Sequence, residues 1–332
     1  MTNTLVTTEH VRTAVQRFTH ADNPSSFLAV NEGNSVFTHG DGPGVVAYRQ
    51  AGRYLVQFGG PFAPESDQAD LLKAFLAFAG EQDRTVVGVQ LQARDVDLYR
   101  ANGFTVNQVG ASYAVDLTRF SLKGSRFMQL RNKISRCHRA GVTVFESTVE
   151  QWADAMRGID SVWLAGKGEH APQLEFLVGQ TGGPMQSRRR LFVAVQDGEL
   201  VGYISYSPVY GSRSGWMHDL SRRRPDYLPG VMEAINKTAI DTFIAEGVRW
   251  LHFGFTPFTG LADDLEPAGH SPGFSALMHL LWEHGEEVYP AQTQLAYKNK
   301  WAPHLVLPEY VAFQGSASLA GFAHIFRAAG AL

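Results

Sequence analysis

Apolar positions near the N-terminus alternate first with a period of two and then with helical spacing. Val45–Tyr48 and Tyr54–Phe58 flank the turn residues Ala51-Gly52, which predicts a β-hairpin. A helix is predicted from about Glu65 to Gln82, followed by a valine-rich strand over Thr85–Leu91. The buried face of this helix is expected to consist of Leu71, Leu72, Phe75, Leu76 and Phe78. The predicted order is therefore strand, strand, helix, strand.

The same order recurs in the second half of the chain. Two strands are predicted over Leu191–Val195 and Leu200–Ser207, on either side of the turn Asp197-Gly198. A third strand is expected to end near Met217, before a helix over Val231–Glu246 and a strand over Trp250–Phe255. We therefore expect an α/β (α+β) fold built of two related modules.

A helix predicted over Lys123–Ala140 lies between the two modules. Its apolar residues Phe127, Leu130, Ile134 and Cys137 share one face, and Gly141 is a typical residue just past a helix end. We expect an N-terminal module over residues 1–120, a basic linker helix over 121–145 and a C-terminal catalytic module over 146–332.

Charge is distributed unevenly along the chain. The 29 basic and 32 acidic residues give a net charge of −3, but the span from Leu117 to Phe145 contains no acidic residue. Its seven basic residues are Arg119, Lys123, Arg126, Arg131, Lys133, Arg136 and Arg139. A localised positive segment in an otherwise acidic protein favours binding of a polyanion, with a solvated linker helix as the alternative.

Several classes of protein are disfavoured by what the sequence lacks. No apolar run approaches the roughly 20 residues that span a bilayer, and the N-terminus has no apolar signal-peptide core, so a cytoplasmic location is expected. The single cysteine, Cys137, excludes an internal disulfide. Histidines are not spaced as metal ligands, and neither a serine-hydrolase elbow nor a nucleotide-binding P-loop occurs, so no metal is expected.

Ordered motifs between about residues 25 and 313 resemble one family. They begin with Asn102-Gly103-Phe104 and the run from Thr105 to Leu117, followed by Lys123-Gly124, Leu130-Arg131-Asn132 and Arg136. The later motifs are Trp163-Leu164 with Lys167, Glu175-Phe176 with Gly179, Asp219-Leu220-Ser221-Arg222, Pro225-Asp226 with Gly230, Phe253–Leu261, His284-Gly285-Glu286, and Tyr297–Trp301 with Pro303 and Tyr310. In this order they resemble the transferase domain of the phosphatidylglycerol lysyltransferase family.

This resemblance implies two tandem acetyltransferase-like modules and transfer of an amino acid from aminoacyl-tRNA, without a cofactor. By the same resemblance, Asp219, Glu286 and Lys298 are expected to be catalytic. The expected substrate-binding residues are Arg222, Gly254, Pro257, Gly260 and Lys300. The expected tRNA-binding residues are Lys123, Arg126, Arg131, Lys133, Arg136 and Arg139.

Each site residue also has a plainer interpretation. Asp219, at the end of its predicted strand, could hold an α-ammonium group or cap the following loop, and Arg222 could contact phosphate or lie in a solvated loop. A strand predicted over Thr293–Tyr297 would place Lys298 and Lys300 on one face, near a developing oxyanion, or else on the surface. Glu286 and His218 are the candidate proton acceptors, and a structural role is the favoured interpretation of His218.

Other features of the sequence bear on the acceptor and on the alternative functions. A chain with no membrane span and a net negative charge favours a small soluble amine or hydroxyl acceptor, with a lipid headgroup as the alternative. An acyl-coenzyme A enzyme of the same fold would need a glycine-rich phosphate loop, whereas Arg222–Gly230 holds two prolines and one glycine. A binding module without catalysis is the third alternative.

Overall fold

The computed structural model describes residues 7–19, 23–166, 175–225 and 227–331. Lys167 and Asp226, which belong to the motifs above, lie outside these described residues. Within the described part of the chain, no helix is both long enough and apolar enough to cross a membrane.

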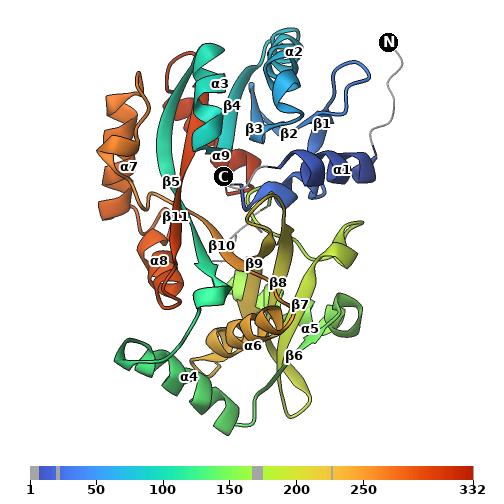
Figure 1. Cartoon of the computed structure of the whole chain (residues 1–332), viewed down its shortest axis with the longest axis vertical. Coiled ribbons are helices and arrows are strands. Elements are labelled where there is room, and N and C mark those ends of the chain that lie inside the picture. Colours follow the sequence, from blue (N-terminus) through green and yellow to red (C-terminus); the bar gives the residue numbers. More distant parts are fainter. Residues whose placement is uncertain (1–6, 20–22, 167–174, 226, 332) are drawn as a thin grey trace.

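The elements follow the chain in three groups (Figure 1). The first group is α1 (Thr8–Phe18), β1 (Ser35–Phe37), β2 (Val45–Ala51), β3 (Tyr54–Phe62), α2 (Gln68–Gly80), β4 (Thr85–Gln92), α3 (Val96–Ala101) and β5 (Phe104–Asp116). The second is α4 (Met128–Arg139), β6 (Thr143–Ser147), α5 (Val149–Ala165), β7 (Arg190–Gln196), β8 (Glu199–Val209), β9 (Gly215–Arg223), α6 (Val231–Ala245) and β10 (Trp250–Pro257). The third is α7 (Pro272–His284), α8 (Ala291–Asn299), β11 (Leu305–Gln314) and α9 (Leu319–Ala328).

All the described strands join one mixed sheet, in the order β1-β2-β3-β4-β11-β5-β10-β9-β8-β7-β6. The pairs β3–β4 and β9–β10 are parallel, and the other pairs are antiparallel. β11, from near the C-terminus, lies between β4 and β5 of the N-terminal half. The mixed α/β class is therefore confirmed. Separate modules with boundaries near residues 120 and 145 stay a prediction, because both halves share this sheet and the end of the chain returns to the first half.

Helices cover both faces of the sheet, and alternating strand residues supply the contacts. In the first half, Phe75 of α2 packs in the same cluster as Leu55, whereas Phe27 packs on the other side with Val56. In the second half, Phe192 contacts α6 side chains and its neighbour Val193 packs with α5. This change of face at successive residues is the expected pattern of a strand buried on both sides.

The predicted apolar face of the basic helix is confirmed. Leu130 and Cys137 of α4 are buried, and Phe127 and Ile134 pack against the same cluster as α6. Figure 1 shows α4 at one end of the molecule, beside α6. Its arginine-bearing side is thereby left exposed.

Two predicted elements were wrong in ways that affect the site. Thr293–Tyr297 is not a strand but part of helix α8, so Lys298 and Lys300 do not share a face. Alanine, glutamine and leucine favour a helix here, while a run this short carries little periodic signal. The third strand of the second half continues past Met217 to Arg223, because pairing with β8 compensates for its polar sequence.

Candidate functional site

Asp219 is the extra residue of a β-bulge in β9. Tyr206 of β8 lies opposite His218 and Ser205 lies opposite Leu220, which leaves Asp219 without a partner residue. Bulges bend a strand and redirect a side chain, and they occur often beside active sites. Asp219 is therefore held within a strand and does not cap a loop.

The surroundings of Asp219 raise its proton affinity. Burial raises its pKa to about 6, although a hydrogen bond from Ser207 Oγ and the nearby Arg189 guanidinium act in the opposite direction. Gly179 packs directly on the carboxyl group, since a Cβ at this glycine would lie 2.2 Å from Asp219 Cγ. A partly buried carboxylate that is mostly ionised at neutral pH is suited to bind an ammonium group.

β9 and β10 separate next to Asp219. They pair in parallel only as far as Met217 and His252, although both strands continue for several residues. On its other side β10 has a bulge between His252 and Gly254 in its pairing with β5, and Gly254 has a φ of +66°. The separation frees backbone groups of both strands for other partners.

Lys298 binds two carbonyl groups of β10 beyond the point where β9 and β10 separate. Its Nζ donates to the carbonyl oxygens of Gly254 at 2.7 Å and Phe255 at 3.0 Å. The side chain is buried, which lowers the pKa of Lys298, and the carboxylate of Glu309 partly opposes this shift. Glu309 is itself buried beside Ser112, and burial raises the pKa of that carboxyl. The ammonium of Lys298 thus loses its proton at a lower pH than that of an exposed lysine.

His218 adjoins Asp219 but is enclosed by aromatic rings. Its ring lies near those of Tyr206, Phe253 and Tyr297, and burial lowers its pKa to about 4. Its Nδ1 lies 3.4 Å from Asn236 Oδ1. A neutral, enclosed imidazole supports the structural role expected for it.

Arg222 lies against α5. Its guanidinium lies 3.7 Å from the ring centroid of Trp163 and 3.9 Å from the carboxylate of Asp160. Burial lowers the pKa of Arg222. The side chain is therefore a packed, cation–π-paired group and not part of a solvated loop.

Glu286 is exposed and caps α8. Its carboxylate accepts hydrogen bonds from Gln292 N at 3.1 Å, Thr293 N at 3.4 Å and Thr293 Oγ1 at 2.8 Å. The hydroxyl of Thr293 is the main cause of its lowered pKa. These contacts explain Glu286 as a stabiliser of the helix that bears Lys298. The structure gives it no contact with Asp219.

The segment after β10 packs on β5. Pro257 lies opposite Gly110, and Gly260, with a φ of +63°, lies against the side chain of Ala111. Gln108 Nε2 donates to the Gly260 carbonyl oxygen at 2.8 Å. Of the glycines and proline predicted to bind substrate, Gly254 accepts a hydrogen bond from Lys298, whereas Pro257 and Gly260 shape the loop.

A pocket of about 260 Å³ lies between the basic helix and Lys300. Lys133 of α4, Arg223 at the end of β9 and Lys300 line it, together with Glu233, which accepts a hydrogen bond from Lys300 at 3.0 Å. The remaining predicted tRNA-binding residues, Lys123, Arg126, Arg131, Arg136 and Arg139, are exposed. Arg131 Nη1 also donates to the carbonyl oxygens of Leu122 and Gly124, which fixes the turn before α4.

Three polar residues near the site were not predicted from the sequence. Arg189 and Glu309 are buried, and Ser207 binds Asp219 directly. Arg189 belongs to the run Arg188–Arg190, which is typical of an exposed charged segment. The folded structure, and not the local sequence pattern, brings Ser207 and Arg189 to Asp219 and Glu309 to Lys298. Among the described residues, no group of His, Cys, Asp and Glu could hold a metal ion.

The family described as phosphatidylglycerol lysyltransferase, C-terminal, matches residues 13–313. Among curated proteins, the phosphatidylglycerol lysyltransferase of Bacillus subtilis is 25% identical over 284 residues, covering 84% of this chain and 32% of that protein. The lysylphosphatidylglycerol biosynthesis bifunctional protein LysX of Rhodococcus opacus is 23% identical over 297 residues, covering 86% of this chain and 26% of its own length. The chain thus spans about a quarter to a third of these two relatives.

Two solved structures share the fold over nearly the whole chain. L-PGS from Bacillus licheniformis has a TM-score of 0.78 at 20% identity, and the match covers 96% of this chain and 95% of that chain. A C-terminal domain (DUF2156) from Agrobacterium fabrum has a TM-score of 0.77 at 21% identity, with 98% of both chains covered. Because the family match includes most of the described residues, the resemblance inferred from the motifs is confirmed. The chain belongs to the phosphatidylglycerol lysyltransferase C-terminal family.

Proposed function

We propose that the chain transfers an aminoacyl group from aminoacyl-tRNA to a hydroxyl group of phosphatidylglycerol. In this reaction the lipid hydroxyl oxygen attacks the ester carbonyl, the bond to the terminal ribose breaks, and the hydroxyl proton passes to the ribose oxygen. The observation that best supports it is the partly buried Asp219 in a bulge beside the separating strands, in a chain of this family. An aminoacyl ester is already activated, so positioning can supply much of the rate.

Asp219 and Lys298 have complementary roles in this proposal. The Asp219 carboxylate binds the α-ammonium group of the aminoacyl ester. Lys298 uses two N–H donors on the carbonyl oxygens of Gly254 and Phe255, and an ammonium has three. The third donor would stabilise the oxyanion that forms on the ester carbonyl.

The basic helix α4 would bind the tRNA backbone. Arg126 is exposed just before this helix, and Arg136 and Arg139 are exposed along it. Lys133 and Lys300 line the adjacent pocket. Phosphate contacts require cations and no base-reading motif. Arg222 remains a predicted binding residue, with Trp163 holding its guanidinium plane.

Two rival functions have less support. A pyrophosphate at the start of α6 would meet the Lys133 carbonyl oxygen, since a Cβ at Gly230 would lie 2.7 Å from it. A carbonyl oxygen repels an anion, so an acyl-coenzyme A donor is disfavoured. The predicted small soluble acceptor also has no support: both curated relatives described above are named for phosphatidylglycerol, so the lipid alternative replaces it.

We also propose that the chain consists of two tandem acetyltransferase-like modules. β3 and β4 pair in parallel only up to Phe58 and Val89, as β9 and β10 do only up to Met217 and His252. β4 also has an extra residue in its pairing with β11, next to Gln90 with a φ of +53°, where β10 has its bulge and Gly254. Equivalent irregularities at equivalent strands support a repeat.

An acceptor competition tests the proposed function. Purified protein receives charged tRNA together with phosphatidylglycerol vesicles and a mixture of soluble amines and polyols, and both phases are analysed by mass spectrometry. We expect an aminoacyl ester in the lipid phase. Lysine is the first amino acid to test, because the relatives are named for it. Aminoacyl products confined to the aqueous phase would contradict the lipid assignment.

A further inference from the structure

Asn31 joins two segments that act on Asp219, one through Gly179 and one through Arg189. It follows the 3₁₀ helix Ser26–Val30 and is only 4% exposed. Its Nδ2 donates to the Val178 carbonyl oxygen at 3.0 Å, and its Oδ1 accepts from Arg189 Nη2 at 2.7 Å. Both ends of one buried amide are therefore used on residues of the other half of the chain.

Each hydrogen-bond partner of Asn31 is linked to a group that acts on the Asp219 carboxyl. Val178 precedes Gly179, whose backbone packs on that carboxyl so closely that a Cβ would overlap it. Arg189 is the charged group that lowers the pKa of Asp219. Its guanidinium is buried over the ring of Phe27, and Nε and Nη1 have no hydrogen-bond partner among the described residues. Asn31 is thus the polar contact that fixes this guanidinium.

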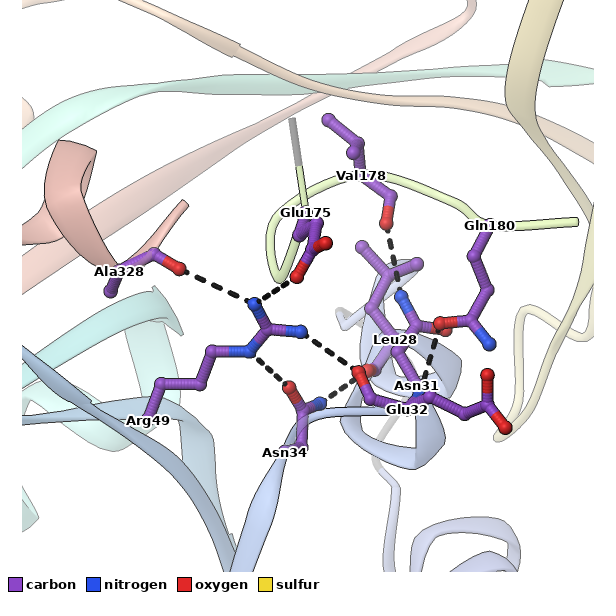
Figure 2. Close-up of polar contacts among 9 residues, drawn as sticks. All are labelled: Leu28, Asn31, Glu32, Asn34, Arg49, Glu175, Val178, Gln180 and Ala328. Atoms are coloured by element: carbon purple, nitrogen blue, oxygen red, sulfur yellow. Dashed lines mark hydrogen bonds and ion pairs between the residues drawn. The ribbon is translucent and has the colours of Figure 1, made fainter. Parts of the chain in front are cut away.

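The segment that contains Gly179 has a second anchor, Arg49 of β2 (Figure 2). Nη1 of Arg49 binds the Glu175 carboxylate at 2.8 Å, and Nη2 donates to the Glu32 carbonyl oxygen at 2.8 Å. Nε donates to Asn34 Oδ1 at 2.9 Å. Figure 2 also shows Gln180 at the other end of the segment, where its Oε1 accepts from Glu32 N at 3.0 Å. The residues from Glu175 to Gln180 are therefore tied to the N-terminal half along their length.

We propose, on the basis of the proposed function, that Asn31 is a positioning residue for the substrate-binding carboxylate of Asp219. It fixes Gly179 against one side of the carboxyl group and holds the Arg189 cation beside it, so the N-terminal half completes the amino-acid site. The motif Glu175-Phe176 with Gly179 gains a physical explanation, because Glu175 anchors the segment and only glycine fits against Asp219.

The groups around Asp219 determine the sign of the expected effect. Arg189 is the charged group that acts on Asp219, Glu32 acts on Arg189, and Ser207 donates a hydrogen bond. Without the Asn31 amide, Arg189 has no fixed hydrogen-bond partner among the described residues, and of the two carboxylates that act on it Asp219 acts more strongly than Glu32. Arg189 is then drawn toward Asp219, so the pKa of Asp219 falls. An aspartate at position 31 would instead hold Arg189 and offset its charge, so the pKa of Asp219 rises.

The test uses Asn31→Ala and the nearly isosteric Asn31→Asp in the full chain, with Asn102→Ala at the end of α3 as the matched control. The pKa of Asp219 is measured by carbon-detected NMR titration, with its signal assigned from Asp219→Asn. We expect an upward shift of about one pH unit in Asn31→Asp, a downward shift in Asn31→Ala and none in the control. The acid limb of kcat/KM for transfer should move in the same direction as the titration in each variant, with an approximately tenfold loss on the acid side for Asn31→Asp.

The outcomes separate this proposal from the proposed function. An unchanged Asp219 titration in folded Asn31 variants overturns the positioning role, even if their melting temperatures fall. If Asn31→Ala does not fold, the test of the positioning role rests on Asn31→Asp, which keeps the side-chain volume. If the titration shifts but the wild-type protein shows no aminoacyl transfer, the positioning role stands and the proposed function fails.

Discussion

Ser207 of β8 donates a hydrogen bond to the carboxylate of Asp219, the one residue of the β9 bulge that has no partner in the ladder. The bulge thus exchanges regular strand pairing for a single side-chain contact. This contact offsets only part of the effect of burial, because the pKa of Asp219 still rises to about 6. A carboxylate kept at such a cost to stability is typical of a binding or catalytic group.

Asp219→Asn should lower transfer and raise stability at the same time. Loss of a charge-assisted contact with the substrate ammonium predicts a decrease in kcat/KM of at least about tenfold. The native carboxyl has a pKa of about 6 against 3.8 for an ordinary aspartate, so its contribution to stability falls as pH rises through this window. The variant should therefore melt at a higher temperature than wild type at pH 7.5, and the difference should vanish near pH 4. A melting temperature of the variant below that of wild type at pH 7.5 would show that the buried carboxylate of Asp219 does not destabilise the protein.

The pH dependence of transfer should also reveal the titration of Asp219. If the substrate ammonium binds ionised Asp219 and the Lys298 ammonium stabilises the oxyanion, kcat/KM should fall about tenfold per unit below about pH 6, and it should fall again as Lys298, whose pKa burial lowers to about 7, loses its proton. A rate profile measured from pH 4.5 to 8 with saturating lipid and limiting donor tests this. A profile with no acid limb near 6 would separate Asp219 from substrate binding.

Charge reversal on α4 should weaken donor binding and its dependence on salt. Arg136→Glu with Arg139→Glu removes two exposed cations, so the slope of log affinity against log salt should become less steep by about two. The control is Arg100→Glu, an exposed arginine of α3 paired with Asp97. Arg131 is unsuitable for this purpose, because it also fixes the turn at Leu122 and Gly124. An unchanged slope would leave α4 a linker helix.

Glu286 offers a test between a capping role and proton transfer. A glutamine retains an oxygen that can accept from Gln292 N and Thr293, so Glu286→Gln should keep most of the activity. Glu286→Ala loses every cap contact and should lower the melting temperature and, through α8 and Lys298, the activity. A loss of more than about a hundredfold in the glutamine variant alone would restore Glu286 as the proton acceptor.

Much of the fold follows from local patterns, whereas the site depends on distant pairing. The hairpin strands, α2 and α6 were predicted because apolar spacing there is long and regular. The strand assigned to Thr293–Tyr297 failed because the segment is short and polar, and its helix is capped by Glu286 from outside the run. Asn31 and Arg189 gave no signal at all, since their roles arise only where two parts of the chain 158 residues apart meet.

A comparison of three donors determines the source of the transferred group. The protein is given phosphatidylglycerol vesicles and either charged tRNA, charged tRNA pretreated with ribonuclease under conditions that preserve the protein, or acetyl-coenzyme A. If aminoacyl-tRNA is the donor, an aminoacyl ester of phosphatidylglycerol should form only with intact charged tRNA. The yield at limiting donor should also fall steeply between about 50 and 200 mM salt. Transfer that resists ribonuclease and uses an acyl-coenzyme A would contradict aminoacyl-tRNA as the donor.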